Sequence, residues 1–304
     1  MRPAPLIALL LVGFGWVCWA VSLPLLRAST ASSANAPVSQ TFVVFDGTLY
    51  KQKADLRQYG IRPITILYEG QFWPNGQAST NLPQQAVVRA LAIQVASSLS
   101  PVVIDIERWP VTGDSLLVQS SVMQYLTVVQ WFRETVPSLR VGFYGTIPVP
   151  DYWRAIQEPT SADFKAWQQD DDRLSMIGQQ VDALFPSLYT FYADRQGWVA
   201  YAIAQITEAR RKANGKPVYA FLWPQYHESN QLLGGKFLEA DYWELELLTT
   251  RQYADGAVIW GGWDGLTNGP AQWDETAPWW QVTKSLLPKM GVLPLKPPGD
   301  VTVY

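Results

Sequence analysis

The chain has 304 residues, of which 48% are hydrophobic and 16% charged, and its formal net charge is -3 at pH 7. This balance excludes a disordered tail and disfavours a nucleic-acid binder that works by neutralising phosphates. A single cysteine (Cys18) and a single histidine (His227) exclude an internal disulfide framework and histidine-rich or cysteine-based metal centres, and we expect no cofactor.

The first 27 residues have the pattern of an export segment. Residues 3–26 carry no charged side chain and lie between Arg2 and Arg27, as is typical of a secretory signal. The run is also long enough to span a bilayer, so a cleaved signal peptide and a retained membrane anchor both remain open. Residues 28–40, rich in serine and alanine, are predicted to be a linker. We expect the domain that follows to be exported: secreted, periplasmic or anchored outside the cytoplasm.

From residue 41 onward, short apolar runs alternate with helical patterns. The predicted strands are Thr41–Asp46, Pro63–Glu69, Val102–Glu107, Arg140–Gly145, Ala183–Phe191, Pro217–Leu222 and Ala257–Gly261. The predicted helices are Gln84–Ser97, Ser115–Thr135, Ser161–Gln180, Trp198–Ala213, Leu238–Tyr253 and Trp279–Leu287. Continuous apolar runs are typical of parallel strands buried on both faces, and their alternation with helices predicts right-handed βαβ units.

Seven strands in this order favour an α/β fold of the TIM type, a closed and seven-stranded (β/α) barrel over residues 41–290. Residues 291–304 are expected to form a C-terminal tail. The competing doubly wound fold carries a glycine-rich phosphate loop after its first strand. Here the sequence at that point is Phe45-Asp46-Gly47-Thr48-Leu49, which provides no phosphate cradle.

In a barrel of this type, functional residues lie at the carboxyl ends of the strands. The predicted ends carry carboxylates and aromatic rings but no cationic side chain: Asp46, Tyr68, Glu69, Asp105, Glu107, Tyr144, Tyr189, Trp223 and Trp260. The 15 tryptophans exceed the needs of an ordinary core, and flat rings suit the stacking of sugars. This set of residues therefore favours protonating and stacking a sugar over holding a phosphate.

Two carboxylates, Asp105 and Glu107, stand at the end of the third predicted strand. The period-two geometry of a strand places both on one face. Carboxylates this close share protons, so the apparent pKa of one of them rises and a protonated acid persists near neutral pH. Glycoside hydrolysis needs such an acid to protonate the leaving oxygen. The alternative without a catalytic role is that Asp105 or Glu107 caps a helix or pairs with Arg108 at the end of the strand.

The mechanism stays open at this stage. A retaining glycosidase normally places a carboxylate nucleophile across the sugar, about 5 Å from the acid, and Asp46 and Glu69 are candidates for that role. In the alternative, the substrate's own 2-acetamido oxygen attacks the anomeric carbon. Glu107 would then be the acid/base and Asp105 would orient the acetamido group.

Six short motifs occur in order along residues 41–265. They are Tyr68-Glu69 with Phe72-Trp73-Pro74 and Leu82-Pro83-Gln84, then Val103-Ile104-Asp105-Ile106-Glu107-Arg108-Trp109, Gly142-Phe143-Tyr144-Gly145, Asp172-Arg173-Leu174-Ser175, Ala183-Leu184-Phe185-Pro186-Ser187-Leu188-Tyr189 and Gly256-Ala257-Val258-Ile259-Trp260-Gly261. In this order the motifs resemble the hyaluronidase family of glycoside hydrolases, and the second is similar to that family's Val-Ile-Asp-Trp-Glu-Glu-Trp signature.

The resemblance implies a seven-stranded barrel and substrate-assisted, retaining hydrolysis of a polysaccharide with 2-acetamido sugars. It implies Glu107 as acid/base, Asp105 as the acetamido-positioning residue and Tyr189 as a hydrogen-bond partner of the acetamido group or of a nearby oxyanion. It also implies that substrate contacts come from the cleft residues Tyr68, Glu69, Trp260, Trp223 and Tyr144, although Tyr144 also fits a packing role. No nucleic acid is implied as a partner, membrane contact is confined to an uncleaved N-terminal segment, and we expect a monomer.

The chain departs from the family pattern in its charges. The family's Tyr-Thr-Arg-Pro at strand six is Phe221-Leu222-Trp223-Pro224 here, so that a hydroxyl and a cation are replaced by apolar rings. A cleft for a polyanion should display lysine or arginine. The sequence therefore indicates the same chemistry on a less charged glycan. Two alternatives remain: a carbohydrate-binding protein that has lost catalysis, and a glycosidase with a separate carboxylate nucleophile.

Overall fold

The computed structural model describes residues 41–74, 76, 81–265 and 267–295. The predicted export segment, the linker and most of the predicted tail lie outside the described residues. Within the described ranges, none of the helices combines the length and the hydropathy that crossing a bilayer requires.

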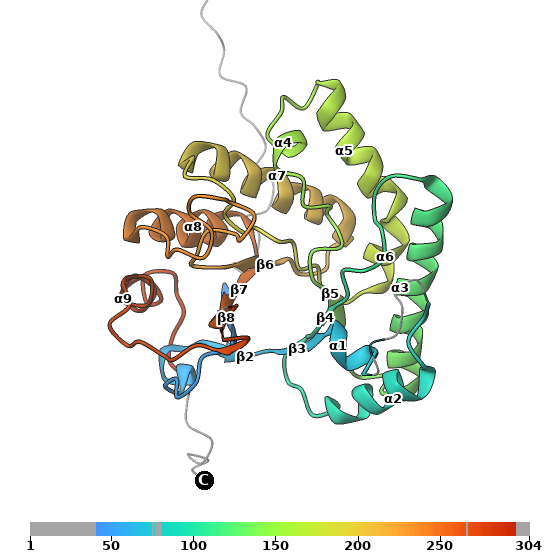
Figure 1. Ribbon diagram of the computed structural model, residues 1–304, viewed down its shortest axis with the longest axis horizontal. Helices are drawn as coiled ribbons and strands as arrows, with labels where there is room; N and C mark the ends of the chain where they lie inside the picture. Colours follow the sequence, from blue (N-terminus) through green and yellow to red (C-terminus); the bar gives the residue numbers. More distant parts are fainter. Residues whose placement is uncertain (1–40, 75, 77–80, 266, 296–304) are drawn as a thin grey trace, which may run out of the picture. The chain divides into compact units, whose positions relative to one another are not determined.

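Parallel strands in two sheets form the centre of the domain (Figure 1). The first sheet has the order β2-β1-β7-β6 and the second the order β3-β4-β5. Their bounds are β1 Val43–Thr48, β2 Arg62–Pro63, β3 Thr65–Tyr68, β4 Val102–Asp105, β5 Val141–Phe143, β6 Tyr219–Leu222 and β7 Gly256–Gly261. Two further short strands, β8 Trp263–Asp264 and β9 Gly269–Pro270, form an antiparallel hairpin outside this ring.

The two sheets close into a barrel. On one side the chain runs from β2 into β3 with one residue between them. On the other side, the predicted strand Ala183–Phe191 makes only isolated parallel bridges, among them Tyr144 to Phe185 and Ser187 to Phe221. Pro186 interrupts this stretch, and since proline has no N–H it cannot continue a ladder. With β2 and β3 counted together as one position and this segment as another, the ring has seven positions, and the predicted seven-stranded barrel is confirmed.

Helices cover the outside of the barrel (Figure 1). Their bounds are α1 Glu69–Phe72, α2 Gln85–Gln94, α3 Ser115–Thr135, α4 Tyr152–Ala155, α5 Ala162–Arg173, α6 Ser175–Gln180, α7 Arg195–Ala213, α8 Ala240–Tyr253 and α9 Pro278–Leu286, with a 3-10 turn at Leu56–Tyr59. The single helix predicted over Ser161–Gln180 is wrong, because the fully buried Leu174 separates α5 from α6. The turns α1 and α4 and the β8–β9 hairpin are too short to produce a periodic pattern.

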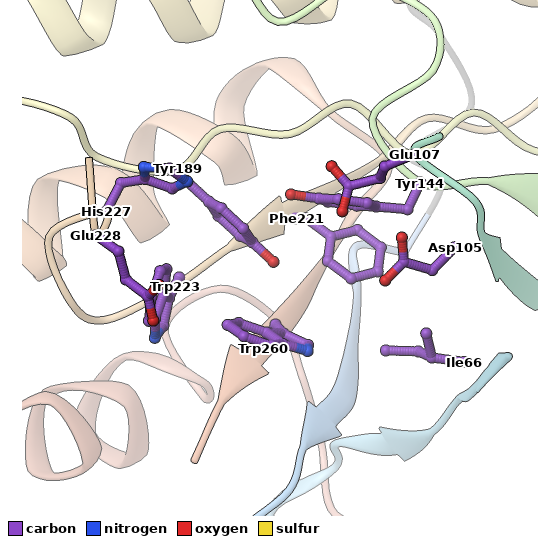
Figure 2. A pocket seen from close by; sticks show the side chains of 10 residues that line it. All are labelled: Ile66, Asp105, Glu107, Tyr144, Tyr189, Phe221, Trp223, His227, Glu228 and Trp260. Carbon is purple, nitrogen blue, oxygen red and sulfur yellow. The ribbon is translucent and has the colours of Figure 1, made fainter. Parts of the chain in front are cut away.

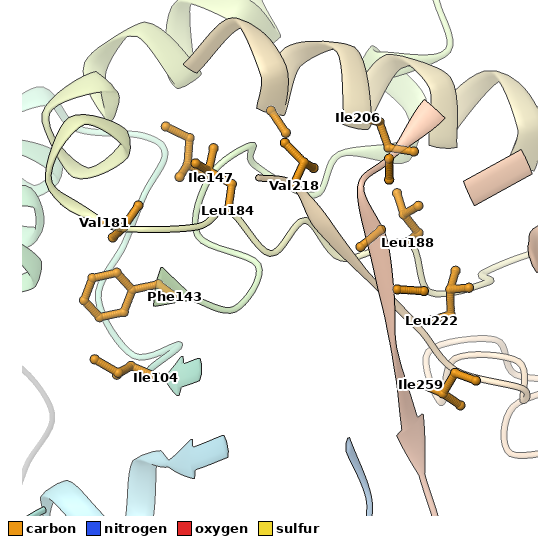
Figure 3. Close-up of a cluster of buried hydrophobic side chains, with 14 of the residues drawn as sticks. Ile104, Phe143, Ile147, Val181, Leu184, Leu188, Ile206, Val218, Leu222 and Ile259 are labelled. Atoms are coloured by element: carbon orange, nitrogen blue, oxygen red, sulfur yellow. The ribbon is translucent and has the colours of Figure 1, made fainter. Parts of the chain in front are cut away.

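Alternate residues along each strand enter two different layers of the core. Val103 belongs to the inner cluster, with Phe45, Phe185 and Val258. Ile104, the next residue on β4, belongs to the larger cluster between strands and helices. Figure 3 shows this outer layer, in which strand residues such as Leu222 and helix residues such as Ile206 meet. The alternation matters for function, because it turns every second residue of β4 toward the barrel interior.

Most of the tryptophans in the described part of the chain belong to the core. Trp167, Trp198, Trp243 and Trp280 are almost fully buried. Trp243 of α8 donates a hydrogen bond to Thr283 of α9 over 2.9 Å, and Trp279 and Trp280 are buried on the same helix. The aromatic surplus that we associated with sugar binding is therefore used largely for packing and for fixing α9.

Candidate active site

A pocket of about 200 Å³ lies at the carboxyl ends of the barrel strands (Figure 2). Its lining residues are Ile66, Asp105, Glu107, Tyr144, Tyr189, Phe221, Trp223, His227, Glu228 and Trp260. Six residues that the sequence singled out therefore meet in one place: Asp105, Glu107, Tyr144, Tyr189, Trp223 and Trp260. Among the described residues, the pocket is lined by three carboxylates and no lysine or arginine.

Strand geometry explains why Asp105 and Glu107 reach this pocket together. Val103 faces the barrel interior, and Asp105, two residues later at the end of β4, shares that face. Glu107 extends the same direction one step beyond the strand, so both carboxyl groups point into the pocket (Figure 2). Asp105 is half-buried, while Glu107 is exposed at the mouth.

The two carboxyl groups are hydrogen-bonded to each other, and both have raised pKa values. Burial raises the pKa of Asp105 to about 7, with further contributions from the negative charges of Glu107 and Glu69. Although Glu107 as a residue is exposed, partial burial of its carboxyl group raises the pKa, and the charge of Glu69 adds to the effect. Protonated Asp105 donates a hydrogen bond to the Glu107 carboxylate. The pair therefore retains one proton near neutral pH, within reach of a ligand at the mouth of the pocket.

The segment that carries Glu107 is held in place by Glu69. The backbone N–H of Glu107 donates to Oε2 of Glu69 over 3.2 Å. The guanidinium of Arg108 donates to Oε1 of the same carboxylate over 2.7 Å and lies over the ring of Trp73, 3.8 Å from its centroid. These bonds favour the ionised form and keep the pKa of Glu69 low in spite of partial burial.

The next residues of this segment are fixed in the core. The carbonyl of Ile106 accepts a hydrogen bond from the hydroxyl of Tyr125 over 2.9 Å. Trp109 is buried and packs edge-on against the Tyr125 ring, with centroids 4.9 Å apart. Asp114 then begins α3, since its side chain accepts hydrogen bonds from two backbone N–H groups of the first turn. Glu107 is thus held from both sides, as a catalytic group requires.

Two tyrosines form the floor of the pocket beside Asp105. The Tyr144 and Tyr189 rings lie 5.7 Å apart and their hydroxyls are hydrogen-bonded. The Tyr144 hydroxyl also bonds Oγ of Ser187 over 3.1 Å. Burial, and for Tyr189 the neighbouring Tyr144, raises the pKa of both phenols above the usual range. Both therefore remain neutral and can act as hydrogen-bond donors.

Aromatic rings form the wall that faces the carboxylates. Trp260 at the end of β7 stacks on Tyr189, with centroids 5.8 Å apart, and meets Trp223 edge-on at 5.0 Å. The Tyr68 hydroxyl accepts a hydrogen bond from Nε1 of Trp260 over 3.1 Å. Gly261 adopts a φ of 139°, and a Cβ at that position would meet the Trp223 ring at 3.1 Å. A glycine after Trp260 therefore lets the chain turn closely past the ring.

Three of the predicted carboxylate and tyrosine positions lie outside the lining of this pocket. Tyr68 supports Trp260 from behind, and Glu69 binds the Glu107–Arg108 segment, as described above. Asp46, considered as a nucleophile, forms an ion pair with Lys53 at 2.7 Å and accepts a hydrogen bond from Thr48. Glu69 and Asp46 are both engaged with cations, and this makes either a poor nucleophile.

The sequence analysis missed two polar residues of the pocket, His227 and Glu228. His227 lies in the loop that follows β6. Its backbone N–H donates to the Thr190 carbonyl over 2.8 Å, which brings it beside Tyr189. Nδ1 accepts the Ser229 backbone N–H over 3.1 Å, and burial lowers the imidazole pKa. The neutral ring therefore carries its proton on Nε2.

Comparison with known proteins supports the fold. No protein-family model matches the chain, and no curated protein matches its sequence. A monoclinic crystal structure of bee venom hyaluronidase is similar, with a TM-score of 0.59, 19% identity and coverage of 82% of this chain and 97% of that chain. A second structure of that enzyme, in complex with a hyaluronic acid tetramer, has a TM-score of 0.59 and 18% identity. The match covers 81% of this chain and 96% of that chain. At this identity the similarity establishes the barrel fold and leaves the reaction to be argued from the site.

Proposed function

We propose that this protein is a glycoside hydrolase that cleaves a polysaccharide containing 2-acetamido sugars. The observation that carries the proposal is the placement of the Asp105 and Glu107 carboxyl groups side by side in a pocket lined by aromatic rings, where burial raises the pKa of both. A general acid with a pKa near the working pH is what protonation of a glycosidic oxygen requires. The similarity of the fold to a hyaluronidase agrees with this chemistry.

The two carboxyl groups differ in burial, and we assign their roles from this difference. Glu107 is exposed at the mouth, where the bond to the next sugar would lie, so we assign it as the acid that protonates the leaving oxygen. Asp105 is deeper, beside the phenols of Tyr144 and Tyr189. When substrate binds, the shared proton would pass from Asp105 to Glu107, so that ionised Asp105 accepts the acetamido N–H. With Tyr189 donating a hydrogen bond to the acetamido group, Asp105 would hold that group beneath the anomeric carbon.

The geometry favours attack by the substrate's own acetamido oxygen. A carboxylate nucleophile must stand about 5 Å from the acid, with the sugar between them. Asp105 and Glu107 share a hydrogen bond, which leaves no space for a ring between them. Since Glu69 and Asp46 bind Arg108 and Lys53, a nucleophile supplied by the substrate agrees best with the pocket. In the second half-reaction, Glu107 would remove the proton of the attacking water.

The direct test measures new reducing ends on a panel of glycans with purified wild type and Glu107→Gln. Loss of a general acid costs roughly 10²–10⁴-fold in rate, and we expect the variant to fall by that range on a 2-acetamido polysaccharide. Glu244→Gln, on the exposed face of α8, serves as the matched control and should retain activity. An unchanged rate in Glu107→Gln would refute the assignment.

A second measurement tests the nucleophile. Donor sugars that carry 2-acetamido or 2-hydroxyl groups are compared with the same leaving group. We expect hydrolysis only of the acetamido donor. A covalent adduct trapped with a 2-fluoro sugar would instead indicate a protein nucleophile, and Glu228 would then be the first carboxylate to substitute because it lines the pocket.

The alternative function is carbohydrate binding without catalysis. The observation in its favour is the apolar wall of Phe221 and Trp223, where the resembling family has a hydroxyl and a cation. This alternative predicts that wild type and Glu107→Gln bind oligosaccharide equally and that neither releases reducing ends. Because residues 3–26 are apolar and uncharged, we further propose that the domain works outside the cytoplasm.

A further inference from the structure

A second and larger cavity adjoins the pocket that holds Asp105 and Glu107. Its volume is about 820 Å³, and it shares Trp223 and Glu228 with the first pocket as common walls. Apart from Tyr50, the remaining walls come from two segments, the loop 225–237 after β6 and the β8–β9 hairpin after β7. A ligand in the first pocket that continues as a chain can therefore extend into the second.

Both segments are held by hydrogen bonds of their own. Within the loop, the backbone N–H of Tyr226 donates to the Lys236 carbonyl and that of Gly235 to the Tyr226 carbonyl, each over 2.9 Å. In the hairpin, the Ala271 N–H donates to the Gly262 carbonyl over 2.8 Å. Gly262 has a φ of 80° and lies against Tyr50, where a Cβ would approach a ring carbon to 2.7 Å. Backbone hydrogen bonds and close packing therefore fix the walls of the second cavity.

Two of these walls present aromatic rings to solvent. Trp263 is 41% exposed and Phe237 46% exposed, and both line the second cavity together with the edge of Trp223. Large apolar side chains are normally buried, so exposed rings around a cavity indicate a binding surface. Aromatic rings along a groove suit a chain of sugar units, because the apolar C–H face of a sugar ring can stack on them.

The charges of this cavity determine what kind of sugar fits. Glu228 stands where the two cavities meet, is exposed, and makes no ion pair with any described residue. Asp264 lines the second cavity and accepts a hydrogen bond from Thr267 over 2.8 Å. Lys236 is the cation of the cavity lining. Over both cavities, the carboxylates Asp105, Glu107, Glu228 and Asp264 outnumber this lysine, and a carboxylate beside an indole is a combination that attracts cations.

We infer that the second cavity is a subsite for a sugar with a free, protonated amine, next to the acetamido sugar that is cleaved, and that Glu228 selects this amine. The inference rests on the proposed function only for the sugar in the first pocket. It identifies the substrate class as a partly N-deacetylated 2-acetamido polysaccharide, and it predicts that an alternating uronate chain is the poorer ligand because Glu228 would repel the carboxylate.

The test measures binding by calorimetry to Glu107→Gln, which needs no hydrolysis, and kcat/KM with the wild type. The probes are three oligosaccharides of equal length: fully N-acetylated, carrying one free amine, and alternating with uronate. We expect the amine-bearing chain to bind about fivefold more tightly than the acetylated chain, the upper value for one exposed charge pair. Glu228→Gln should remove this preference, and Glu244→Gln should retain it.

The aromatic walls are tested by chain length. Trp263→Ala should weaken binding of a tetrasaccharide about fivefold while leaving the binding of a disaccharide within twofold, because only the longer chain reaches the second cavity. Equal losses for both lengths would contradict an extended groove.

The outcomes separate this inference from the proposed function. If no glycan releases reducing ends but the amine preference depends on Glu228, the hydrolase proposal fails and the subsite stands. If hydrolysis occurs but Glu228→Gln leaves the preference unchanged, the subsite assignment is refuted. A preference for the uronate chain that depends on Lys236 also refutes it. So does loss of all hydrolysis in Glu228→Gln with binding intact, since Glu228 would then be part of the chemistry.

Discussion

The two walls of the pocket are constructed differently. The wall with Asp105 and Glu107 comes from a strand and a short segment tied down by Glu69, Tyr125 and the start of α3. Another wall, which we call the loop wall, carries His227 and Glu228 and comes from a loop that follows β6. We propose that the first wall determines the reaction, because its atoms are positioned from several sides, and that the second selects the substrate. Loops on a rigid barrel are where such selectivity usually resides.

We call the wall with Asp105 and Glu107 the strand wall, and we expect substitutions there to have the largest effect on catalysis. Asp105→Asn preserves the shape of the side chain but removes the proton acceptor for the acetamido N–H and the partner that shares the Glu107 proton. We expect kcat to fall by about 10²–10³-fold with binding of the substrate within a few-fold. Steady-state kinetics with an independent binding measurement checks this split, and a loss confined to KM would show that Asp105 serves binding alone.

The same substitution should stabilise the fold at alkaline pH. The pKa of Asp105 in the folded protein, about 7, lies above the unfolded value of about 3.9. The ionised form is therefore disfavoured by folding, and stability falls as pH rises from about 4 to about 7. Asp105→Asn removes this penalty, so urea unfolding at pH 8 should show a gain of about 1–2 kcal/mol and at pH 4 none. A loss at pH 8 would mean that Asp105 carries no buried charge there.

The loop wall should show a smaller and different effect. His227→Gln removes the Nε2–H donor from the pocket, while the amide can still accept from the Ser229 backbone N–H. We expect KM to rise about fivefold, the worth of one neutral hydrogen bond, with kcat within twofold. A large fall in kcat would instead place His227 in the chemical step and remove the distinction between the two walls.

The smallest predicted effect is a shift in the pH profile. In addition to burial, the negative charge of Glu69 raises the pKa of both Asp105 and Glu107. In Glu69→Gln that charge is gone and Arg108 loses its partner, and both changes favour ionisation of the pair. The alkaline limb of kcat/KM should move down by about half a pH unit. Movement in the opposite direction would show that Glu69 acts on the pair through structure alone.

The sequence predicted the strand wall because period-two alternation is a local rule. Val103, Asp105 and Glu107 share a face whatever surrounds them, and the apolar run before them requires a buried strand. The loop wall follows no such rule. The position of His227 depends on a hydrogen bond to Thr190, 37 residues earlier in the chain, and that of Glu228 on how the loop 225–237 closes. Pairings of this kind leave no periodic trace.

Two other differences have similar physical causes. The segment 183–190 is strand-like in composition, yet Pro186 prevents a continuous ladder and leaves single bridges. The tryptophan count indicated a sugar cleft, but Trp167 and Trp198 are buried with their Nε1 groups bonded to backbone carbonyls. Composition cannot distinguish a ring that packs in a core from one that faces a cavity, because only the fold determines which side is open.

The central claim is that Glu107 donates a proton to the leaving oxygen, and its most direct test compares two leaving groups. The first-turnover release rate is measured for wild type and Glu107→Gln on a 2-acetamido oligosaccharide and on the same sugar with an activated aryl group. An aryloxide leaves without protonation, so we predict a loss of about 10²–10⁴-fold on the oligosaccharide and less than about tenfold on the aryl glycoside. Equal losses on both substrates would contradict a role for Glu107 as the acid.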